Sequence, residues 1–287
     1  MPQFSIITTC KGRLHHLRES LPRFLAQPDT EVVVVDYDCP DGTAAFVRSE
    51  YPAAQVVKVE DAPLFRLAHA RNLGAERATG AWFAFIDADV ILVPDFIARI
   101  RTVIAEGRYF RFPTLDSAKH GLYGSCVVRS ADYDAIHGYD AAIQGYAGED
   151  GDFYSRLRLV KVVRVDLDDA LIERVLQHDN LSRTTHHRIK SVADCLRVNS
   201  AYRMVKNTLL RQFEVTELPE SLREKLYHLV ETRVTEALAA SEDTVRLAIP
   251  LPDDREFEPL VEWTCTRHVY FELKIKRMVF EPEYREE

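Results

Sequence analysis

The chain lacks several features that would place it in a familiar class. Its formal net charge of −8 leaves no excess of basic residues, so we expect no nucleic-acid partner. No basic segment followed by an apolar one opens the sequence, so no signal peptide is predicted. No run reaches the roughly 18 apolar residues that are needed to cross a bilayer. We therefore expect a cytoplasmic protein without a transmembrane segment, and peripheral attachment to the inner face of the membrane stays open.

The cysteines are few, and their spacing suits neither disulfides nor zinc. Their number is odd and no two form a C-x-x-C pair, which argues against a disulfide framework and a zinc knuckle. We expect them to be reduced thiols. The five are Cys10, Cys39, Cys126, Cys195 and Cys265.

Strand and helix patterns alternate along the first third of the chain, which is typical of βαβ units and a mostly parallel sheet. The 287 residues suffice for one large α/β domain, with or without an appendage. The expected strands are 4–9, 31–36, 54–59 and 81–86, and the expected helices are 14–26, 44–50 and 69–78. The carboxyl ends of these strands should share one polar edge, where open α/β sheets bind ligands.

The most informative feature is an Asp-x-Asp triplet, a DXD motif, at that edge. Asp87 and Asp89 follow the apolar run 81–86, which is typical of a strand buried on both faces. Two such carboxylates can hold a hard divalent cation against a diphosphate. The alternative is an ordinary strand-ending turn, and the context favours the functional interpretation.

The ends of the first two expected strands add polar groups. Backbone amides after Thr8, together with Lys11 and Arg13, suit an anion such as a diphosphate. The alternative is a solvated basic turn. Asp36 and Asp38, after the second strand, could accept hydrogen bonds from a ribose or a nucleobase. The alternative for both is a helix N-cap.

The helix before the acidic strand opens with Arg71 and Asn72, which we also assign to the ligand site at this edge of the sheet. Arg71 could pair with a phosphate or with Asp87, and the alternative is a surface salt bridge.

A glycine-rich acidic stretch, 145–153, contains Tyr146, Glu149 and Asp150. Neighbouring carboxylates repel one another, so the cluster needs a function or full solvation. Flanking glycines permit a loop that closes over a substrate. Alternatively, the acids favour the first turn of a helix, and both interpretations can hold together.

His178 ends a further expected strand, 172–177. An imidazole there can complete the coordination of a metal that carboxylates already hold. Alone it would be a structural or exposed histidine, so its role depends on the other segments.

Taken together, these motifs resemble the GT-A fold nucleotide-sugar glycosyltransferases. The N-terminal half is similar to family 2 enzymes, and the stretch 124–157 to the galactosyltransferase C-terminal region. Arg13 with His16-Leu17 is similar to the Arg-x-x-His-Leu element of β-1,4-galactosyltransferases. The resemblance covers roughly residues 3–190.

The resemblance implies a role for each matching residue. Asp89 and His178 would bind Mn²⁺ (or Mg²⁺), with Asp87 supporting the metal or the ribose. Asp150 would be the general base, and Glu149 would contact the acceptor sugar.

Two departures from the family pattern bear on the substrate and the metal. Tyr146 replaces a tryptophan that platforms the sugar, which leaves the identity of the sugar open. Val175 stands where the galactosyltransferases often supply another metal ligand, which implies weaker metal affinity.

The implied reaction is metal-dependent, inverting transfer of a hexose, of galactose or N-acetylhexosamine type, from a UDP-sugar to a glycan hydroxyl in surface polysaccharide synthesis. The alternatives are a retaining glycosyltransferase, a nucleotidyltransferase, and a sugar-nucleotide-binding protein without turnover.

We expect a GT-A catalytic domain over 1–188, with a nucleotide-sugar half (1–108) and an acceptor half (109–188). A mainly helical extension with terminal strands, 189–287, should follow. Its clearest helix, 221–240, carries one apolar stripe, so we expect it to pack onto the catalytic domain. Acceptor binding, membrane association and homodimer formation stay open as roles for the extension.

Overall fold

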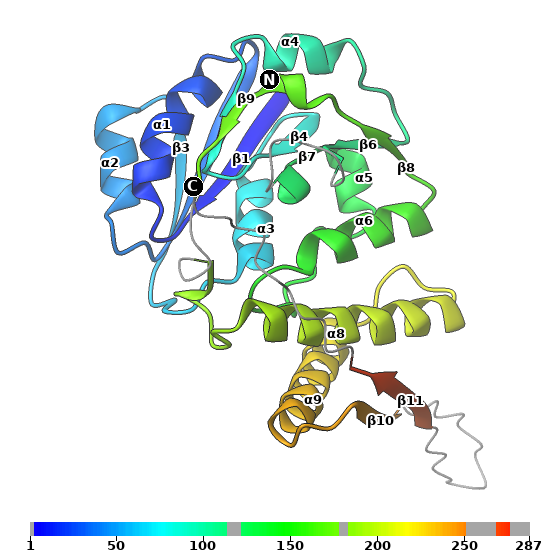
Figure 1. The fold of residues 1–287 in the computed structure, drawn as a ribbon. Helices are drawn as coiled ribbons and strands as arrows, with labels where there is room; N and C mark the ends of the chain where they lie inside the picture. The colour runs from blue at the N-terminus through cyan, green and yellow to red at the C-terminus, as the bar shows by residue number, and fades with distance from the viewer. Residues whose placement is uncertain (1–2, 114–121, 178–182, 251–267, 276–287) are drawn as a thin grey trace, which may run out of the picture.

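The computed structural model describes residues 3–113, 122–177, 183–250 and 268–275. In these residues a seven-stranded sheet forms the centre of the molecule, in the order β3-β2-β1-β4-β7-β6-β8 (Figure 1). Its strands are β1 (Phe4–Cys10), β2 (Thr30–Tyr37), β3 (Gln55–Val59), β4 (Trp82–Phe85), β6 (Arg108–Arg111), β7 (Cys126–Arg129) and β8 (Val163–Asp166).

The sheet is mostly parallel, as predicted. Within this sheet only β7 is antiparallel to its neighbours, β4 and β6, and all other neighbouring strands are parallel. The sequence did not indicate β6 or β7, because each has only four residues and ends on an arginine. Strands this short show too few alternations to reveal a period of two.

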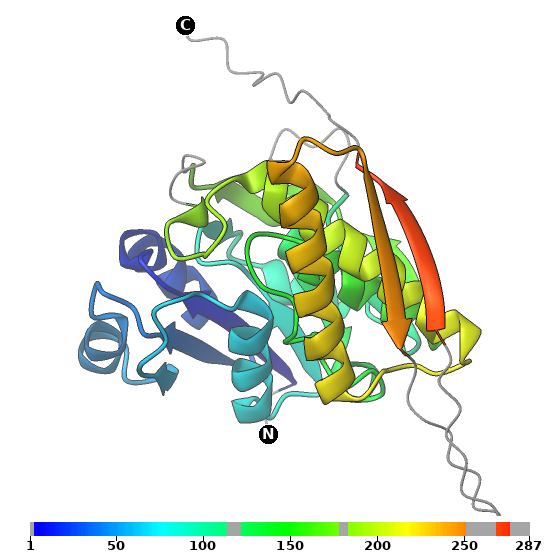
Figure 2. The ribbon, with the colours of Figure 1, turned by 90° about the horizontal axis from the view of Figure 1, so that it is seen from below.

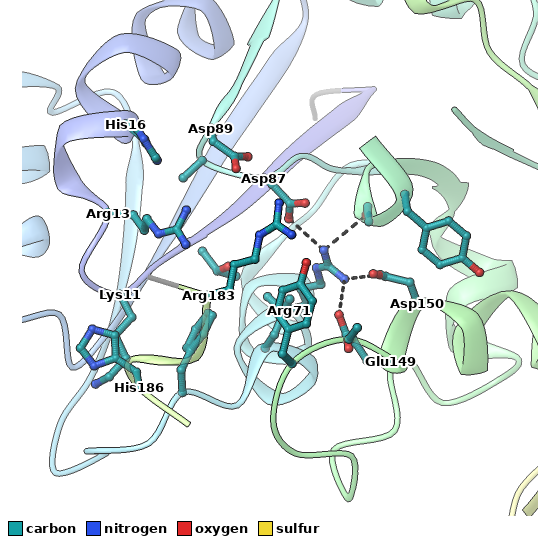
Figure 3. Close-up of a pocket in the computed structure, with 18 of the residues that line it drawn as sticks. Lys11, Arg13, His16, Arg71, Asp87, Asp89, Glu149, Asp150, Arg183 and His186 are labelled. Carbon is teal, nitrogen blue, oxygen red and sulfur yellow. Dashed lines mark hydrogen bonds and ion pairs between the residues drawn. The ribbon is translucent and has the colours of Figure 1, made fainter. Parts of the chain in front are cut away.

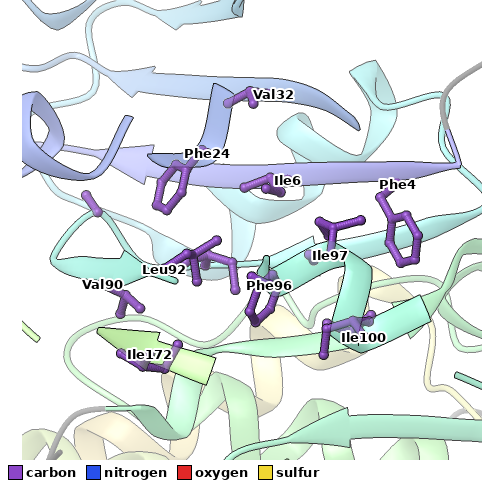
Figure 4. Close-up of a cluster of buried hydrophobic side chains, with 14 of the residues drawn as sticks. Phe4, Ile6, Phe24, Val32, Val90, Leu92, Phe96, Ile97, Ile100 and Ile172 are labelled. Atoms are coloured by element: carbon purple, nitrogen blue, oxygen red, sulfur yellow. The ribbon is translucent and has the colours of Figure 1, made fainter. Parts of the chain in front are cut away.

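Helices cover both faces of the sheet because side chains alternate between the faces along each strand. Ile6 belongs to a buried cluster that includes side chains of α1, α2 and α4, and its neighbour Ile7 belongs to a second cluster with side chains of α3, α5 and α6. Figure 4 shows the first of these two clusters. The helices are α1 (Leu14–Leu25), α2 (Thr43–Glu50), α3 (Leu67–Arg77), α4 (Phe96–Arg101), α5 (Ser130–Asp134) and α6 (Glu149–Leu159).

The strand ends meet at one edge, as the sequence predicted. Cys10 pairs with Asp36, and Ile7 pairs with Phe85, so Asp87 lies beside the end of β1. Two short elements follow: β5 (Val90–Leu92) pairs antiparallel with β9 (Ile172–Val175). The amide of Leu176 donates to the carbonyl of Asp89 at 2.8 Å, which holds the end of β9 beside the DXD motif. Two 3-10 turns, η1 (Leu122–Gly124) and η2 (Asp169–Leu171), complete this part.

In Figure 1 the C-terminal extension lies beneath the sheet and its helices, which form the expected catalytic part, and Figure 2 shows the extension from below. It contains α8 (Val192–Gln212), α9 (Glu220–Ala239) and the antiparallel pair β10 (Thr244–Pro250) and β11 (His268–Lys274). The described part of the chain thus ends one residue after β11, at residue 275. A buried apolar cluster joins Ile143 of the catalytic part to Val198 of α8 and Val230 of α9.

Buried ion pairs reinforce this junction. Lys206 of α8 is 1% exposed and lies 2.6 Å from Asp140 and 2.5 Å from Asp152. Arg223 of α9 contacts Asp140 at 2.7 Å, and Arg156 contacts Asp152 at 2.8 Å. Since each charge is paired, the network removes the large penalty of an isolated buried ion. The extension is thus tied to α6, the helix that carries the acidic stretch.

Within the described residues, no helix is both long and apolar enough to span a bilayer. The helix α6 starts at Glu149, inside the acidic stretch. Glu149, Asp150 and Asp152 occupy its first turn, where the helix dipole favours negative charge.

Candidate active site

A cavity of about 280 Å³ opens at the carboxyl edge of the sheet. Its walls come from the ends of β1 and β4, the start of α6 and the segment 183–187 (Figure 3). This volume is close to the lower end of the range of ligand sites, roughly 300 Å³. Of the predicted site residues, its lining includes Lys11, Arg13, Arg71, Asp87, Asp89, Tyr146, Glu149 and Asp150.

Arg71 is the centre of the acidic side of this cavity. Its guanidinium is 3% exposed and donates to Asp87 at 2.9 Å, to the carbonyl of Gly124 at 3.3 Å, and to Asp150. Glu149 lies 3.9 Å away. Of the pairings proposed for Arg71, the one with Asp87 is observed, and the salt bridge is buried and not superficial. The Arg71 guanidinium thereby joins the DXD motif to the acidic residues of α6.

Gly124 is required for this arrangement. A Cβ atom at this position would lie 2.7 Å from Arg71 Nη2, 2.9 Å from Asp87 and 3.1 Å from Asp150. Real Cβ atoms almost never approach another atom within 3.0 Å, so a larger residue would displace the side chains of Arg71 and Asp87.

Burial changes the acidity of two of these carboxylic acids. Burial, and then repulsion from Asp150, raises the pKa of Glu149 to about 8. Burial also raises the pKa of Asp87 above its usual value, although the nearby Arg71 opposes the change. Glu149 therefore carries a proton at neutral pH and can donate a hydrogen bond. Perturbed acids in a cleft are typical of functional sites.

The loop before α6 is held by the C-terminal extension. Asn199 of α8 donates from Nδ2 to the carbonyl of Gln144 at 2.9 Å and to that of Ala147 at 2.5 Å. Gly148 has φ of +106°, a conformation that L-residues rarely adopt, and a Cβ there would lie 2.6 Å from the Cβ of Asn199. The positions of Tyr146 and Glu149 thus depend on α8.

The opposite side of the cavity is basic. Arg13 and Arg183 both line it, and Figure 3 shows them facing Asp87 and Asp89. Burial lowers the pKa of Arg13, while Asp89 and Asp87 raise it. The Arg183 guanidinium lies 5.7 Å from the ring centroid of Tyr146.

Lys11 lines the cavity, but its ammonium group is already engaged. Its Nζ donates to the carbonyls of Tyr37 at 3.1 Å, Asp38 at 2.8 Å and Ala62 at 2.8 Å. An ammonium has three N–H donors, so Lys11 supplies positive potential and fixes the loops after β2 and β3. It does not offer a free donor to a diphosphate, contrary to the simplest prediction.

Two assignments at the strand ends need correction. Thr8 is 1% exposed and lies outside the cavity lining, whereas Thr9 lines it. A strand turns adjacent side chains to opposite faces, and only one can face the site. The carboxylate of Asp36 accepts from the amides of Cys39 at 2.8 Å and Ala44 at 2.6 Å. Asp36 thus stabilises the start of α2, which was the alternative left open, and it is not in the lining.

Asp38 and Asn72 also lie outside the cavity lining. Asp38 accepts from the amide of Ala62 at 3.2 Å and is part of the loop that Lys11 fixes. Asn72 donates to the carbonyl of Tyr139 at 2.9 Å and accepts from its amide at 2.8 Å. Because its amide group is used on the backbone, Asn72 connects α3 to the segment after α5 and does not face a donor.

The described residues offer a metal two carboxylates. Asp87 and Asp89 both face the cavity, and no set of three or more His, Cys, Asp or Glu side chains suited to a metal occurs among residues 3–113, 122–177, 183–250 and 268–275. His178, the third predicted ligand, lies outside these residues. One or two carboxylates, completed by substrate phosphates and water, fit Mg²⁺ or Mn²⁺.

The segment 183–187 contributes more than the sequence predicted. Arg183, His186 and His187 all line the cavity. His187 is 5% exposed, and burial lowers its pKa to about 4, so it is neutral at pH 7. These residues had no predicted role from the sequence, because no periodic strand or helix pattern predicts that they reach the edge of the sheet.

The fold is shared with solved glycosyltransferases. The mannosyltransferase PcManGT from Pyrobaculum calidifontis, in complex with GDP-Man and Mn²⁺, matches with a TM-score of 0.52 and 17% identity over 84% of this chain and 75% of that one. TarS from S. aureus, residues 1–349 in complex with UDP-GlcNAc, matches with a TM-score of 0.55 and 15% identity, over 83% of this chain and 73% of that one. At these identities the likeness establishes the GT-A fold.

The sequence of the first part of the chain also matches a family model. Residues 5–120 match the model of the Glycosyl transferase family 2 domain. Curated proteins give no match to this chain. The match covers residues 5–120 of the 287, and together with the GT-A fold it supports glycosyltransferase activity for this chain. The matched stretch ends before Glu149, so the resemblance of 124–157 to galactosyltransferases remains a proposal.

Proposed function

We propose that this enzyme transfers a hexose, of galactose or N-acetylhexosamine type, from a UDP-sugar to a hydroxyl of a carbohydrate acceptor with inversion. Surface polysaccharide synthesis is the role proposed for it. One observation carries the proposal: Asp87 and Asp150 contact the same buried guanidinium, that of Arg71, in one cavity. The carboxylate proposed to serve the donor, Asp87, and the one proposed to take the acceptor's proton, Asp150, thus lie in the same cavity.

On the donor side, Asp87 and Asp89 would hold Mn²⁺ or Mg²⁺ with the diphosphate, and His178 is proposed as a further ligand. The metal would act as a Lewis acid that stabilises the charge on the leaving diphosphate. Arg13 and Arg183 line the same region, and their fixed charges would oppose the same growing negative charge. Thr9, and not Thr8, supplies the polar side chain from the end of β1.

On the acceptor side, Asp150 would take the proton of the attacking hydroxyl. The acceptor oxygen forms a bond to the anomeric carbon, the bond from that carbon to the diphosphate oxygen breaks, and its electron pair leaves with UDP. Attack from the face opposite the leaving group inverts the configuration. Glu149, whose pKa is raised to about 8, carries a proton and would hydrogen-bond the acceptor sugar. A positioned base of this kind typically contributes about 10²–10⁴ in rate.

Tyr146 would contact the transferred or accepting sugar from the loop 145–148. The Asn199 contacts to this loop reduce its freedom, which would place Tyr146 and Glu149 before the substrate binds. Preorganisation of this kind lowers the entropic cost of reaching a reactive geometry.

A panel of nucleotide sugars tests the proposal. UDP-glucose, UDP-galactose, UDP-GlcNAc, UDP-GalNAc and GDP-mannose would be offered with Mn²⁺, and nucleotide release and thermal stabilisation would be measured. We expect release of UDP from at least one UDP-hexose, and stabilisation that depends on Mn²⁺. Release of pyrophosphate would indicate nucleotidyl transfer instead, and turnover of GDP-mannose alone would contradict the choice of nucleotide.

The stereochemistry is tested separately. NMR of the first product formed should show the anomeric configuration opposite to that of the donor. Retention would remove Asp150 from the role of a base on the opposite face.

A further inference from the structure

Two thiols lie together beneath the turn that borders the donor side of the cavity. Cys10 is the last residue of β1, and Cys39 follows the end of β2. The register of the two strands pairs Cys10 with Asp36 and so brings the cysteines close together. Their Sγ atoms are 4.0 Å apart. The mechanism proposed above uses neither of them.

The surroundings give the two sulfurs different chemistry. Cys39 is partly exposed, and the amide of Gly12 donates to its Sγ at 3.1 Å. The hydrogen bond from Cys10 is the largest of several effects that lower the pKa of Cys39 to about 5. Cys10 is fully buried, and its hydrogen bond to Cys39, followed by burial, raises its pKa. Cys39 is thus the thiolate, and Cys10 is the neutral thiol beside it.

We propose that Cys39 and Cys10 form a redox-active pair, which a hydroperoxide converts into a disulfide under the turn 11–13. The Cys39 thiolate attacks the peroxide oxygen, the O–O bond breaks, and after proton uptake water and a Cys39 sulfenic acid result. Cys10 then attacks the Cys39 sulfur, the S–O bond breaks, and a second water leaves with the proton from Cys10. Overall, two thiols and hydrogen peroxide give one disulfide and two waters.

The other described cysteines are less suited to this reaction. Cys126 is 1% exposed, and burial raises its pKa to about 12. Cys195 is also 1% exposed, and burial raises its pKa as well. Because the thiolate is the reactive form and needs access to the oxidant, both should react far more slowly than Cys39.

The pair is connected to the cavity through Gly12. The amide of Gly12 donates to Cys39, and its neighbours Lys11 and Arg13 both line the cavity. Oxidation draws the Cys39 sulfur towards Cys10 and away from that amide. Resting on the proposed function, we infer that the disulfide weakens UDP binding and that reduction restores it.

Peptide mapping of the full chain tests the pair without any assay of transfer. After treatment with hydrogen peroxide at pH 7, we expect the loss of two hydrogen atoms and a peptide that contains a Cys10–Cys39 disulfide. Before that, Cys39 should consume peroxide at least about tenfold faster than Cys126 or Cys195. Four unchanged thiols among the described cysteines, or preferential oxidation at another of them, would overturn the proposal.

Substitutions separate the two roles. Cys10→Ser should leave a Cys39 sulfenic acid that dimedone traps, and Cys39→Ser should remove the fast reaction. Cys195→Ala is the matched control and should still form the disulfide. The variant Cys265→Ser, at a position outside the described residues, should also form it. If Cys265→Ser abolishes the disulfide, Cys10 is not the resolving thiol.

Binding of UDP to the reduced and the oxidised wild-type protein, by calorimetry, tests the coupling. We expect weaker binding after oxidation and recovery with dithiothreitol, and neither change in Cys10→Ser. If the mapped disulfide forms while UDP affinity stays the same, the link to the donor site is wrong. If neither form binds UDP, the proposed function fails, although the mapped disulfide stands.

Discussion

Arg71 donates a 2.9 Å hydrogen bond to Asp87 from a position where its side chain is 3% exposed. The same guanidinium also donates to Asp150, so it links the DXD motif to the first turn of α6. Three carboxylic acids lie around this guanidinium, and its removal would leave the buried Asp150 without its cationic partner. The site therefore depends on Arg71 both for its geometry and for its electrostatic balance.

Replacement of Arg71 should damage stability and activity together. Arg71→Lys keeps the charge but cannot make the forked contacts of a guanidinium, and Arg71→Met removes the charge. Loss of one partner from a buried ion pair typically costs about 3–5 kcal/mol, so we expect Arg71→Met to lose stability of that order in urea unfolding. Arg71→Lys should lose less. Arg77→Lys, at an exposed position of the same helix, is the control, and equal stability of Arg71→Met and Arg77→Lys would contradict the role of Arg71.

Glu149 should make the protein less stable as the pH rises. Its pKa is about 8 in the folded protein against the usual 4.5 of a glutamate, so the folded state holds a proton that the unfolded chain releases. The contribution of this group is complete below pH 4.5 and is lost as the pH rises towards 8. The loss should be of order a few kcal/mol.

Glu149→Gln keeps the shape of the side chain but does not titrate. Thermal unfolding should show that it gains stability over the wild type at pH 8 and little at pH 5. Parallel curves for the two proteins across this range would contradict the raised pKa.

Asn199 should act on catalysis from a distance, as a positioning residue. Asn199→Ala removes hydrogen bonds to the carbonyls of Gln144 and Ala147, and the unpaired groups should cost about 1–3 kcal/mol. Because the loop then moves more freely, kcat should fall about tenfold while UDP affinity is retained. Thr208→Ala, at an exposed site on the same helix, should change neither. A loss of UDP binding equal to the loss of kcat would indicate general misfolding instead.

Asp89 should govern the dependence on metal. Asp89→Asn removes one of the two proposed anionic ligands, so a higher Mn²⁺ concentration should be needed for half-maximal UDP release. His178→Ala tests the third proposed ligand in the same titration. An unchanged midpoint in either variant would exclude that residue from the metal site. A wild-type enzyme that works fully in excess EDTA would exclude the metal from the mechanism.

The sequence predicted the fold where its periodicity was strong. The apolar strand runs, with helix patterns between them, indicate a mostly parallel sheet that is covered on both faces. Four-residue β6 and β7 carry too little pattern, so the antiparallel member of the sheet could not be predicted.

Site residues could be predicted where their position in the chain also fixes the direction of the side chain. Asp87 comes just after β4 and Glu149 opens α6, and both line the cavity. Thr8 and Asp36 are also at strand ends, but their side chains turn into the core or onto the backbone of α2. Residue type alone does not reveal such a direction. The part played by Arg183 depends on tertiary packing that no local pattern encodes.

The central claim is that Asp150 takes the proton of the acceptor hydroxyl while Asp87 and Asp89 serve the donor. The most direct measurement compares Asp150→Asn with the wild type, for kcat of transfer and for the Kd of the UDP-sugar in the presence of Mn²⁺. Asp134→Asn, at an exposed position, is the control. We predict that kcat falls by about 10²–10⁴ while the Kd stays within a few-fold. Near-full turnover by Asp150→Asn would contradict the account.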